Sequence, residues 1–358
     1  MRLVLFAQRH CASDALSILA VSLTFACLFA GTATAATINV PADQPTIQDA
    51  INVANNGDLI LVARGTYKEN INYQGKAVTI RSANGPAHTI IDGGNFNTVV
   101  TFQTGETSTS VLEGFTIQNG SASFGAGITL LGTSPTIIRN IFRNNAEGSG
   151  GFGAAIGGNG SSPVIEQNEF MNNTCDSQFL SGVVSFVNGS SPLIMNNLFM
   201  RNPCRAINMT LPTGNTPVIA FNTIVGNSVG IRVDARVATS TQLYANNILV
   251  SNGTGLEVDF FVSGDQPSWD NNLVFGNSAN YFGIADQTGA NGNISADPLF
   301  INQNANNFQL HSGSPAIDAG TLAISHLPPT DFAGHPRVVD GDGDGDLLPD
   351  MGAFEFIP

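Results

Sequence analysis

Six segments of this sequence align without gaps over eleven positions, and this repeat constrains the fold more than any other feature. They are residues 135–145, 163–173, 192–202, 217–227, 242–252 and 267–277, and successive copies begin 28, 29, 25, 25 and 25 residues apart. Position 6 is always asparagine, and so is position 11. A weaker copy covers residues 109–119, with Gly114 at position 6. A period of this length indicates a stack of similar units.

Two further positions of the repeat are apolar in every copy. Position 3 is Ile, Ile, Ile, Ile, Tyr and Trp, and position 8 is Phe, Phe, Phe, Ile, Leu and Val. Short strands there would point these side chains inward, and coils stacked about 4.8 Å apart would build one continuous core. The sequence therefore predicts an all-β fold, a right-handed parallel β-helix over residues 36–296. Trp269, at position 3 of the last copy, is expected in this core rather than in a sugar-binding surface.

The invariant asparagine at position 6 lies between two predicted strands of each coil. Asparagine tolerates the left-handed backbone conformation of a sharp turn, and its amide can hydrogen-bond to the equivalent residue of the next coil. We therefore expect one asparagine ladder along an edge of the stack, formed by Asn140, Asn168, Asn197, Asn222, Asn247 and Asn272. A ligand-binding role for these residues is the alternative interpretation.

Residues 1–35 have the pattern of an export signal. Arg2 and Arg9 precede an uncharged apolar run from Ala15 to Ala30, and Ala33-Thr34-Ala35 forms a small-residue cleavage site. The run is short for a membrane-spanning helix, and no later segment approaches about 20 apolar residues. We expect a secreted protein, extracellular or at the cell surface, with no membrane span after signal cleavage. The alternative is an uncleaved N-terminal anchor.

Two features of the remaining chain suit a secreted stack. The segment Thr46–Asn55 places four apolar residues on one helical face, which predicts a short helix covering the N-terminal end of the core. Cys175 and Cys204 both fall at position 13 of successive copies, counted from the first residue of each. They should therefore lie one above the other, and an oxidising compartment favours a disulfide between them. Two buried free thiols are the alternative.

The charge of the chain limits the kinds of partner it can have. The formal net charge is −14, and charged residues make up only 11% of the sequence. The basic residues are scattered without forming a stripe. Such a surface repels a phosphate backbone, so we expect no nucleic-acid partner.

The best candidates for catalysis lie on two segments that begin 25 residues apart, 230–237 and 255–262. Alternation along a strand turns Ile231, Val233, Leu256 and Val258 inward and leaves the charged residues outward. The outward set is Arg232, Asp234, Arg236, Glu257 and Asp259.

In this arrangement Asp234 would stack on Asp259 at about 4.8 Å. Two such carboxylates repel, which raises one pKa and can supply an acid beside a base, or the pair can hold Ca²⁺. The alternative is a solvated strand in which Arg232 pairs with Glu257 and Arg236 offsets the aspartates.

The strongest metal-site pattern lies near the C-terminus. The segment DGDGDGDLLPD supplies hard oxygen ligands at alternate positions, with glycines that permit a sharp turn: Asp340, Asp342, Asp344, Asp346 and Asp350. It departs from a calcium-binding EF-hand loop because Met351 occupies the twelfth position. These carboxylates would repel strongly without a cation, so we expect them to gather around one Ca²⁺. A solvated acidic loop is the alternative.

The sequence also resembles known protein families. The segment from Thr46 through NNGDLILVARGTYKENI, followed by coils with regular asparagines, is similar to the pectin-lyase-like superfamily of right-handed β-helices. Gly65, Tyr67 and Glu69 match the G-x-Y-x-E of pectin methylesterases, but the later motifs of that family are missing and its activity does not transfer.

Residues 297–358 resemble a C-terminal module called a choice-of-anchor Q domain. The matching segments are DPLF, SPAIDAG, DFAGHPR and DMGAFEF. We expect this module to form a cap packed on the last coil.

The superfamily resemblance implies work on extracellular polysaccharide, by lyase or hydrolase chemistry, or glycan binding at a cell surface. It equally includes non-catalytic surface, matrix and adhesin proteins, because a fold does not determine a function. Both hypotheses remain open at this point. In either case we expect the protein to be a monomer.

Overall fold

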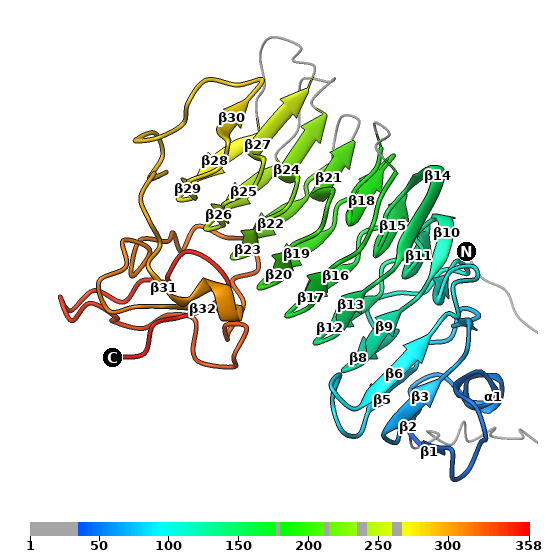
Figure 1. Ribbon diagram of the computed structural model, residues 1–358. Helices are drawn as coiled ribbons and strands as arrows, with labels where there is room; N and C mark the ends of the chain where they lie inside the picture. The colour runs from blue at the N-terminus through cyan, green and yellow to red at the C-terminus, as the bar shows by residue number, and fades with distance from the viewer. Residues whose placement is uncertain (1–34, 177–179, 211–214, 235–241, 260–266) are drawn as a thin grey trace, which may run out of the picture. The chain divides into compact units, whose positions relative to one another are not determined.

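The computed structural model describes residues 35–176, 180–210, 215–234, 242–259 and 267–358. Three parallel sheets, here called A, B and C, run along the stack, and each coil contributes one strand to each sheet in turn (Figure 1). This arrangement confirms the parallel β-helix. The signal segment lies outside the described residues, except for Ala35.

The strands of the three sheets follow the order of the coils. Sheet A contains β1 (Thr37–Val40), β2 (Leu59–Val62), β5 (Thr79–Ser82), β8 (Val111–Glu113), β12 (Thr136–Ile138), β16 (Val164–Glu166), β19 (Leu193–Met195), β22 (Val218–Ala220), β25 (Leu243–Ala245) and β28 (Ser268–Asp270). Sheet B contains β3 (Gly65–Tyr67), β6 (Thr89–Asp92), β9 (Thr116–Gln118), β13 (Ile141–Arg143), β17 (Glu169–Met171), β20 (Leu198–Met200), β23 (Thr223–Val225), β26 (Ile248–Val250) and β29 (Leu273–Phe275).

Sheet C carries the residues of functional interest. It contains β4 (Ile71–Asn72), β7 (Val100–Phe102), β11 (Ile128–Leu131), β15 (Ile156–Asn159), β18 (Val184–Val187), β21 (Arg205–Thr210), β24 (Val229–Asp234), β27 (Thr254–Asp259) and β30 (Ala279–Phe282). A parallel pair, β10 (Ser121–Phe124) and β14 (Ala146–Phe152), lies outside the three sheets, and an antiparallel pair, β31 (Phe300–Asn302) and β32 (Asn307–Leu310), flanks the short 3-10 helix η1 (Gln303–Ala305).

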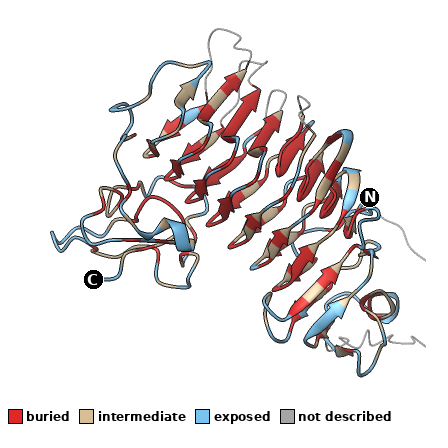
Figure 2. Cartoon of the chain, viewed as in Figure 1, coloured by how far each residue is buried: buried red, intermediate tan, exposed pale blue. Residues whose placement is uncertain are grey.

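The apolar repeat positions form the core, as the sequence predicts. All six residues at position 8 and all six at position 3 are buried, Trp269 with 2% exposure (Figure 2). The rings of Phe142, Phe170 and Phe199 stack along sheet B with centroids 4.8 and 4.5 Å apart. Tyr244 stacks on Trp269 at 4.5 Å. Identical register in successive coils thus joins one row of the core to the next.

The predicted asparagine ladder is present. In each step the side-chain Oδ1 of one asparagine accepts hydrogen bonds from the backbone N–H and the Nδ2 of the preceding one, as from Asn168 to Asn197 at 2.9 and 3.1 Å. The ladder continues past Asn272 to Asn293. The asparagines at position 11 form a second ladder in the same way, from Asn145 to Asn277.

One detail of the ladder prediction is wrong. The left-handed conformation falls on the residue at position 5, just before each ladder asparagine, with φ between 51° and 57°. These residues are Arg139, Gln167, Asn196, Phe221, Asn246 and Asn271. The ladder residue itself must point its amide along the stack, so the preceding residue adopts the left-handed conformation that the turn requires.

The N-terminal helix and the disulfide agree with their predictions. Helix α1 (Ile47–Val53) buries Ile47, Ala50 and Ile51, and Thr46 caps its N-terminus by accepting the N–H of Asp49 at 3.0 Å. Cys175 and Cys204 are bonded, with their Cα atoms 5.8 Å apart.

The G-x-Y-x-E segment is structural. Both carboxylate oxygens of Glu69 accept N–H groups of the first turn of α1, from Ile47 and Gln48 at 3.0 Å. The hydroxyl of Tyr67 donates to the carbonyl of Ala63 at 3.0 Å. This segment therefore holds the helix against the first coils.

The C-terminal module does not lie only on the last coil. It packs along the corner between sheets A and B, where Ile324 joins Met195 and Phe221 in one apolar cluster and Phe308 joins Leu198 in another. The module covers outward-facing side chains of these coils, whereas it leaves the equivalent positions of the earlier coils uncovered. The apolar surface available on this flank explains why the module lies there.

The position-5 residues attach this module to the corner. Gln167 donates to the carbonyl of Asp331 at 2.6 Å, Asn246 exchanges two hydrogen bonds with the backbone of Thr321, and Asn271 donates to Ala319. We call Gln167, Asn196, Phe221, Asn246 and Asn271 the corner row.

Arg337 is the buried charge that joins the module to this row. It is 1% exposed, lies over the ring of Phe221 at 4.5 Å, donates to Asn196 Oδ1 and pairs with Glu355. A buried guanidinium requires such partners, because leaving it without them would cost several kcal/mol.

Candidate functional site

The two strands predicted to carry charged residues are β24 and β27, adjacent in sheet C. Their register pairs Arg232 with Glu257 and Asp234 with Asp259, as the spacing of 25 residues indicated. The inward residues of both strands, such as Val233, are buried in the core. Arg236 lies outside the described residues.

The outward side chains are not a solvated row, and this part of the alternative interpretation is wrong. Arg232 is fully buried and Asp234 is 1% exposed. The Nε and Nη2 atoms of Arg232 donate to Asp259 Oδ2 at 2.9 and 2.5 Å, and its Nη1 donates to Asn208 Oδ1 at 2.8 Å. The expected pair with Glu257 is present at 3.3 Å. Burial removes water from the guanidinium, so carboxylate and amide oxygens must replace it.

The charged group extends to the preceding coils through Arg205, the first residue of β21. Its Nη2 lies 4.0 Å from Glu257 Oε1, and its Nη1 donates to the carbonyl of Ser181 at 3.5 Å. The Ser181 hydroxyl in turn donates to Glu147 Oε1. Glu147 belongs to β14, so the group connects a sheet C strand with the pair of strands outside the three sheets.

Glu147 has the environment of a proton-transfer group. It is 9% exposed, and its Oε2 atom is buried without a hydrogen-bond partner among the described residues. Burial, the largest cause, raises the pKa of Glu147 to about 7, while the Ser181 hydroxyl opposes that rise. Burial also lowers the pKa of Arg205, against the attraction of Glu257.

We call Glu147, Arg205, Arg232, Glu257 and Asp259 the sheet C network. Its exposed edge consists of Arg205, Glu257 and Asp259, whose side chains are 21%, 14% and 27% exposed. The network therefore combines guanidinium groups, which match anionic ligands, with a carboxyl group that titrates near neutral pH. Binding of a charged sugar and proton transfer are the chemistry that it could support.

Sequence reasoning missed Glu147 and its partner Ser181. Both lie in segments that follow the eleven-position repeat, where coil lengths vary and no spacing rule applies. Glu147 stands in the glycine-rich run AEGSGGFG, whose only signal is a lone acidic residue. Nothing in that run indicates which coil it contacts.

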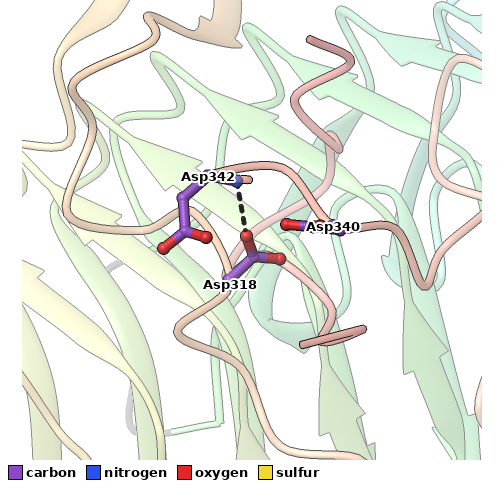
Figure 3. Close-up of side chains that lie close together, drawn as sticks. All are labelled: Asp318, Asp340 and Asp342. Carbon is purple, nitrogen blue, oxygen red and sulfur yellow. Dashed lines mark hydrogen bonds between the residues drawn. The ribbon is translucent and has the colours of Figure 1, made fainter. Parts of the chain in front are cut away.

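The acidic loop of the C-terminal module brings two predicted ligands together with a third that was not predicted. Carboxylate oxygens of Asp318, Asp340 and Asp342 lie within 4.8 Å of one another (Figure 3). Asp318 Oδ2 accepts the N–H groups of Gly341 and Asp342 at 2.9 and 2.8 Å. Carboxylate oxygens are the ligands that Ca²⁺ prefers, and this acidic group could hold such a metal ion.

The other three predicted ligands lie apart from this group. Asp344 and Asp346 are exposed, and Asp344 accepts the N–H of Asp346 at 2.8 Å. Asp350 is 1% exposed and accepts the N–H groups of Asp318 and Phe356 at 2.8 and 2.6 Å. Burial raises the pKa of Asp350 to about 6. Its carboxylate holds the backbone that carries Asp318.

Comparison with known proteins places this architecture in a family. The model of the family described as right-handed beta helix region matches residues 47–248. The chain therefore belongs to the right-handed β-helix proteins, and the predicted handedness is confirmed.

One solved structure is similar to this chain over most of the length of both chains. It is the crystal structure of pectate lyase Pel9A, with a TM-score of 0.53 and 15% sequence identity. The match covers 86% of this chain and 90% of that one. At this identity the likeness concerns the fold. No curated protein matches the chain significantly.

Within the described residues, no helix is both long and apolar enough to cross a membrane.

Proposed function

We propose that this chain is a secreted β-helix protein that binds or cleaves extracellular polysaccharide at the sheet C network. The observation that carries the proposal is Glu147, a buried carboxyl group with a pKa raised to about 7, linked through Ser181 to the partly exposed Arg205. Buried acids of this kind are typical of active sites, although structural networks also contain them. The similarity to pectate lyase Pel9A supports a polysaccharide as the ligand.

In this proposal each residue of the network has a distinct role. Glu147 gives or takes a proton near neutral pH. Arg205 contacts an anionic or hydroxyl group of the sugar at the exposed edge. Glu257 and Asp259 hold Arg232 in place, and Arg232 in turn fixes the edge that they form. The reaction would be that of a polysaccharide lyase or a glycoside hydrolase.

The test is a screen of the mature protein against acidic and neutral polysaccharides, with and without Ca²⁺. New reducing ends report any cleavage, and absorbance of an unsaturated product separates a lyase from a hydrolase. Glu147→Gln keeps the Ser181 hydrogen bond but removes the titrating proton, so turnover should fall at least about 100-fold. Glu113→Gln is the matched control. Glu113 lies on β8 of sheet A and pairs with the exposed Arg139 at 3.0 Å.

A non-catalytic surface or matrix protein is the second candidate function. The observation that favours it is the complete burial of Arg232 among Asp259, Glu257 and Asn208, which is the arrangement of a structural ion-pair network. In that case no polysaccharide would be cleaved, and Glu147→Gln would change stability alone.

We also propose that Asp318, Asp340 and Asp342 bind Ca²⁺ in the C-terminal module. Their clustering supports this, since three carboxylates at this separation repel unless a cation is shared. The ion would stabilise the module on the flank of the stack. Titration of the metal-free protein with Ca²⁺, followed by calorimetry, tests this proposal directly.

A further inference from the structure

A second feature of sheet C lies nearer the N-terminal end of the stack. A groove with a volume of about 560 Å³ runs over the outer face of β4, β7 and β11. Asn72 and Thr101, register partners on β4 and β7, belong to its floor, and Gln103 lies just beyond β7. None of the described residues that line the groove is charged.

One wall of the groove is the strand β10, which contributes Ser123 and Phe124. This strand is held from both sides, by pairing with β14 and by a bridge between Ser121 and Asn97. Phe124 also packs edge to face against Phe152 of β14, with ring centroids 4.1 Å apart. The wall is therefore fixed before any ligand arrives, which lowers the entropic cost of binding.

The close contact of β14 with this wall depends on glycine. A Cβ atom at Gly151 would lie 1.8 Å from the carbonyl oxygen of Ser123, nearer than any side chain allows. The two strands could not approach in this way with another residue there.

The polar residues of the groove differ in their partners, and Asn72 and Asn97 each accept a backbone N–H through their side chains. The hydroxyls of Thr98 and Thr129 lie 3.0 Å from each other and both lie within hydrogen-bond distance of the carbonyl of Phe124, so they maintain the groove itself. The side chains of Thr101, Gln103 and Ser123 make no hydrogen bond with any residue that the structure describes. Their hydroxyl and amide groups therefore offer both donors and acceptors to a ligand.

This combination of groups selects for an uncharged, hydroxyl-rich ligand. Neutral hydroxyls and amides can exchange hydrogen bonds with sugar hydroxyls, while Phe124 and the exposed Leu131 offer apolar surface to the C–H face of a sugar ring. An ionised ligand would lose water here and find no opposite charge, which is unfavourable.

We infer that this groove binds an uncharged stretch of a polysaccharide, a run of neutral pyranose units, next to the sheet C network. The inference rests on the proposed function and names the ligand for the N-terminal part of the same face. The groove adjoins the network, which supports the inference, because the groove residue Ala122 is the register partner of Glu147. Three strand steps separate β11 from β21, about 14 Å, a length that a few sugar units span.

The experiment measures binding of uncharged and charged oligosaccharides to the mature protein by isothermal titration calorimetry. The probes are cellohexaose, xylohexaose, mannohexaose and hexagalacturonate. Two variants remove the free groups of the groove, Ser123→Ala and the double variant Thr101→Val with Gln103→Ala. Gln309→Ala, an exposed glutamine on β32, is the matched control. Far-UV circular dichroism and thermal melting confirm that each variant is folded.

We expect at least one neutral hexasaccharide to bind wild type and the Gln309→Ala control equally. Each lost hydrogen bond should weaken its binding about fivefold, so the double variant should bind about 25-fold more weakly. Binding should be nearly independent of NaCl concentration, because no charge pair is formed.

Two results would overturn the inference while leaving the proposed function standing. One is neutral binding that the groove variants do not change, and the other is binding of hexagalacturonate alone, weakened by salt and by Arg205→Ala. If wild type binds none of the probes at millimolar concentration and cleaves no polysaccharide, both the inference and the proposed function are wrong.

Discussion

Substitution of Asn197 by alanine tests the first asparagine ladder at its centre. The Nδ2 of Asn197 donates to the carbonyls of Ile165 and Met195 at 2.9 and 2.8 Å and to Asn222 Oδ1 at 3.0 Å. Its Oδ1 accepts the backbone N–H of Asn168 at 2.9 Å. Alanine removes all of these bonds and leaves the Asn168 N–H buried without its acceptor.

The expected loss follows from counting these groups. The Nδ2 of Asn197 carries only a pair of hydrogens, so its contacts count as about two hydrogen bonds of about 1 kcal/mol net each, and the orphaned buried N–H of Asn168 adds about 1–3 kcal/mol. Asn197→Ala should therefore lower the free energy of unfolding by about 3–5 kcal/mol, which is a large fraction of the stability of most domains. The backbone N–H of Asn197 keeps its bond to Asn222 Oδ1, so the next coil should retain its corner.

Urea unfolding followed by far-UV circular dichroism measures this change. Asn304→Ala is the matched control, because Asn304 is exposed and its side chain makes no hydrogen bond within the described residues; it should change stability by less than about 0.5 kcal/mol. If Asn197→Ala unfolds within about 1 kcal/mol of wild type, the ladder contributes little and the reasoning is refuted.

Three further predictions concern other parts of the molecule. Ser251→Gly should raise the free energy of unfolding by about 1 kcal/mol in the same assay, because Ser251 has φ 57° where Gly226 and Gly276 occupy the equivalent position; an unchanged midpoint would contradict this. The raised pKa of Glu147 means that the folded state holds its proton more tightly, so its contribution to stability is full below pH 4.5 and is lost as pH rises to about 7. The stability advantage of Glu147→Gln over wild type should therefore grow across that interval in thermal melts, and a constant difference would refute the raised pKa. The wild type should melt at a lower temperature in chelator than in Ca²⁺, because Ca²⁺ at about 100 times its Kd raises the free energy of unfolding by about 2.7 kcal/mol. Asp342→Asn should remove most of that difference, and equal melting of the wild type in both conditions would exclude the proposed site.

The stack could be predicted from sequence because every coil repeats the same local requirements. Each position-3 and position-8 residue is apolar for one reason, burial between neighbouring coils, so six copies of the pattern report the same fact. The disulfide between Cys175 and Cys204 follows from the same register, since equal positions of successive coils must stack. Periodic features are therefore well determined by sequence.

The position-5 residues show where this reasoning fails. Propensity assigns the left-handed conformation to asparagine, yet Arg139 and Phe221 adopt it with φ 57° while the ladder asparagines do not. A left-handed non-glycine residue costs about 1–2 kcal/mol, which is less than the hydrogen bonds that each ladder asparagine makes. Tertiary bonding thus outweighs local preference at these corners.

The position of the C-terminal module left a signal in the sequence that the repeat analysis did not use. Outward position 4 is Ile or Glu in the first two strong copies, whereas it is Met195, Ala220 and Ala245 in the following three. Outward position 9 changes one copy earlier, from Arg143 in the first strong copy to Met171, Met200 and Val225 in the next three. Apolar residues on an outward face indicate that something covers it, and the module does so.

The candidate site could be predicted only in the part that obeys the repeat. Arg232, Glu257 and Asp259 were found because they occupy equivalent positions of neighbouring coils. Glu147 was not, because its place beside Ser181 depends on how two segments outside the repeat fold over sheet C. Those segments are free to vary without disturbing the core, which is why chemistry specific to this chain is expected in them. A homologous β-helix with the same ladders but a different residue in place of Glu147 should therefore keep the fold and lose the proposed activity.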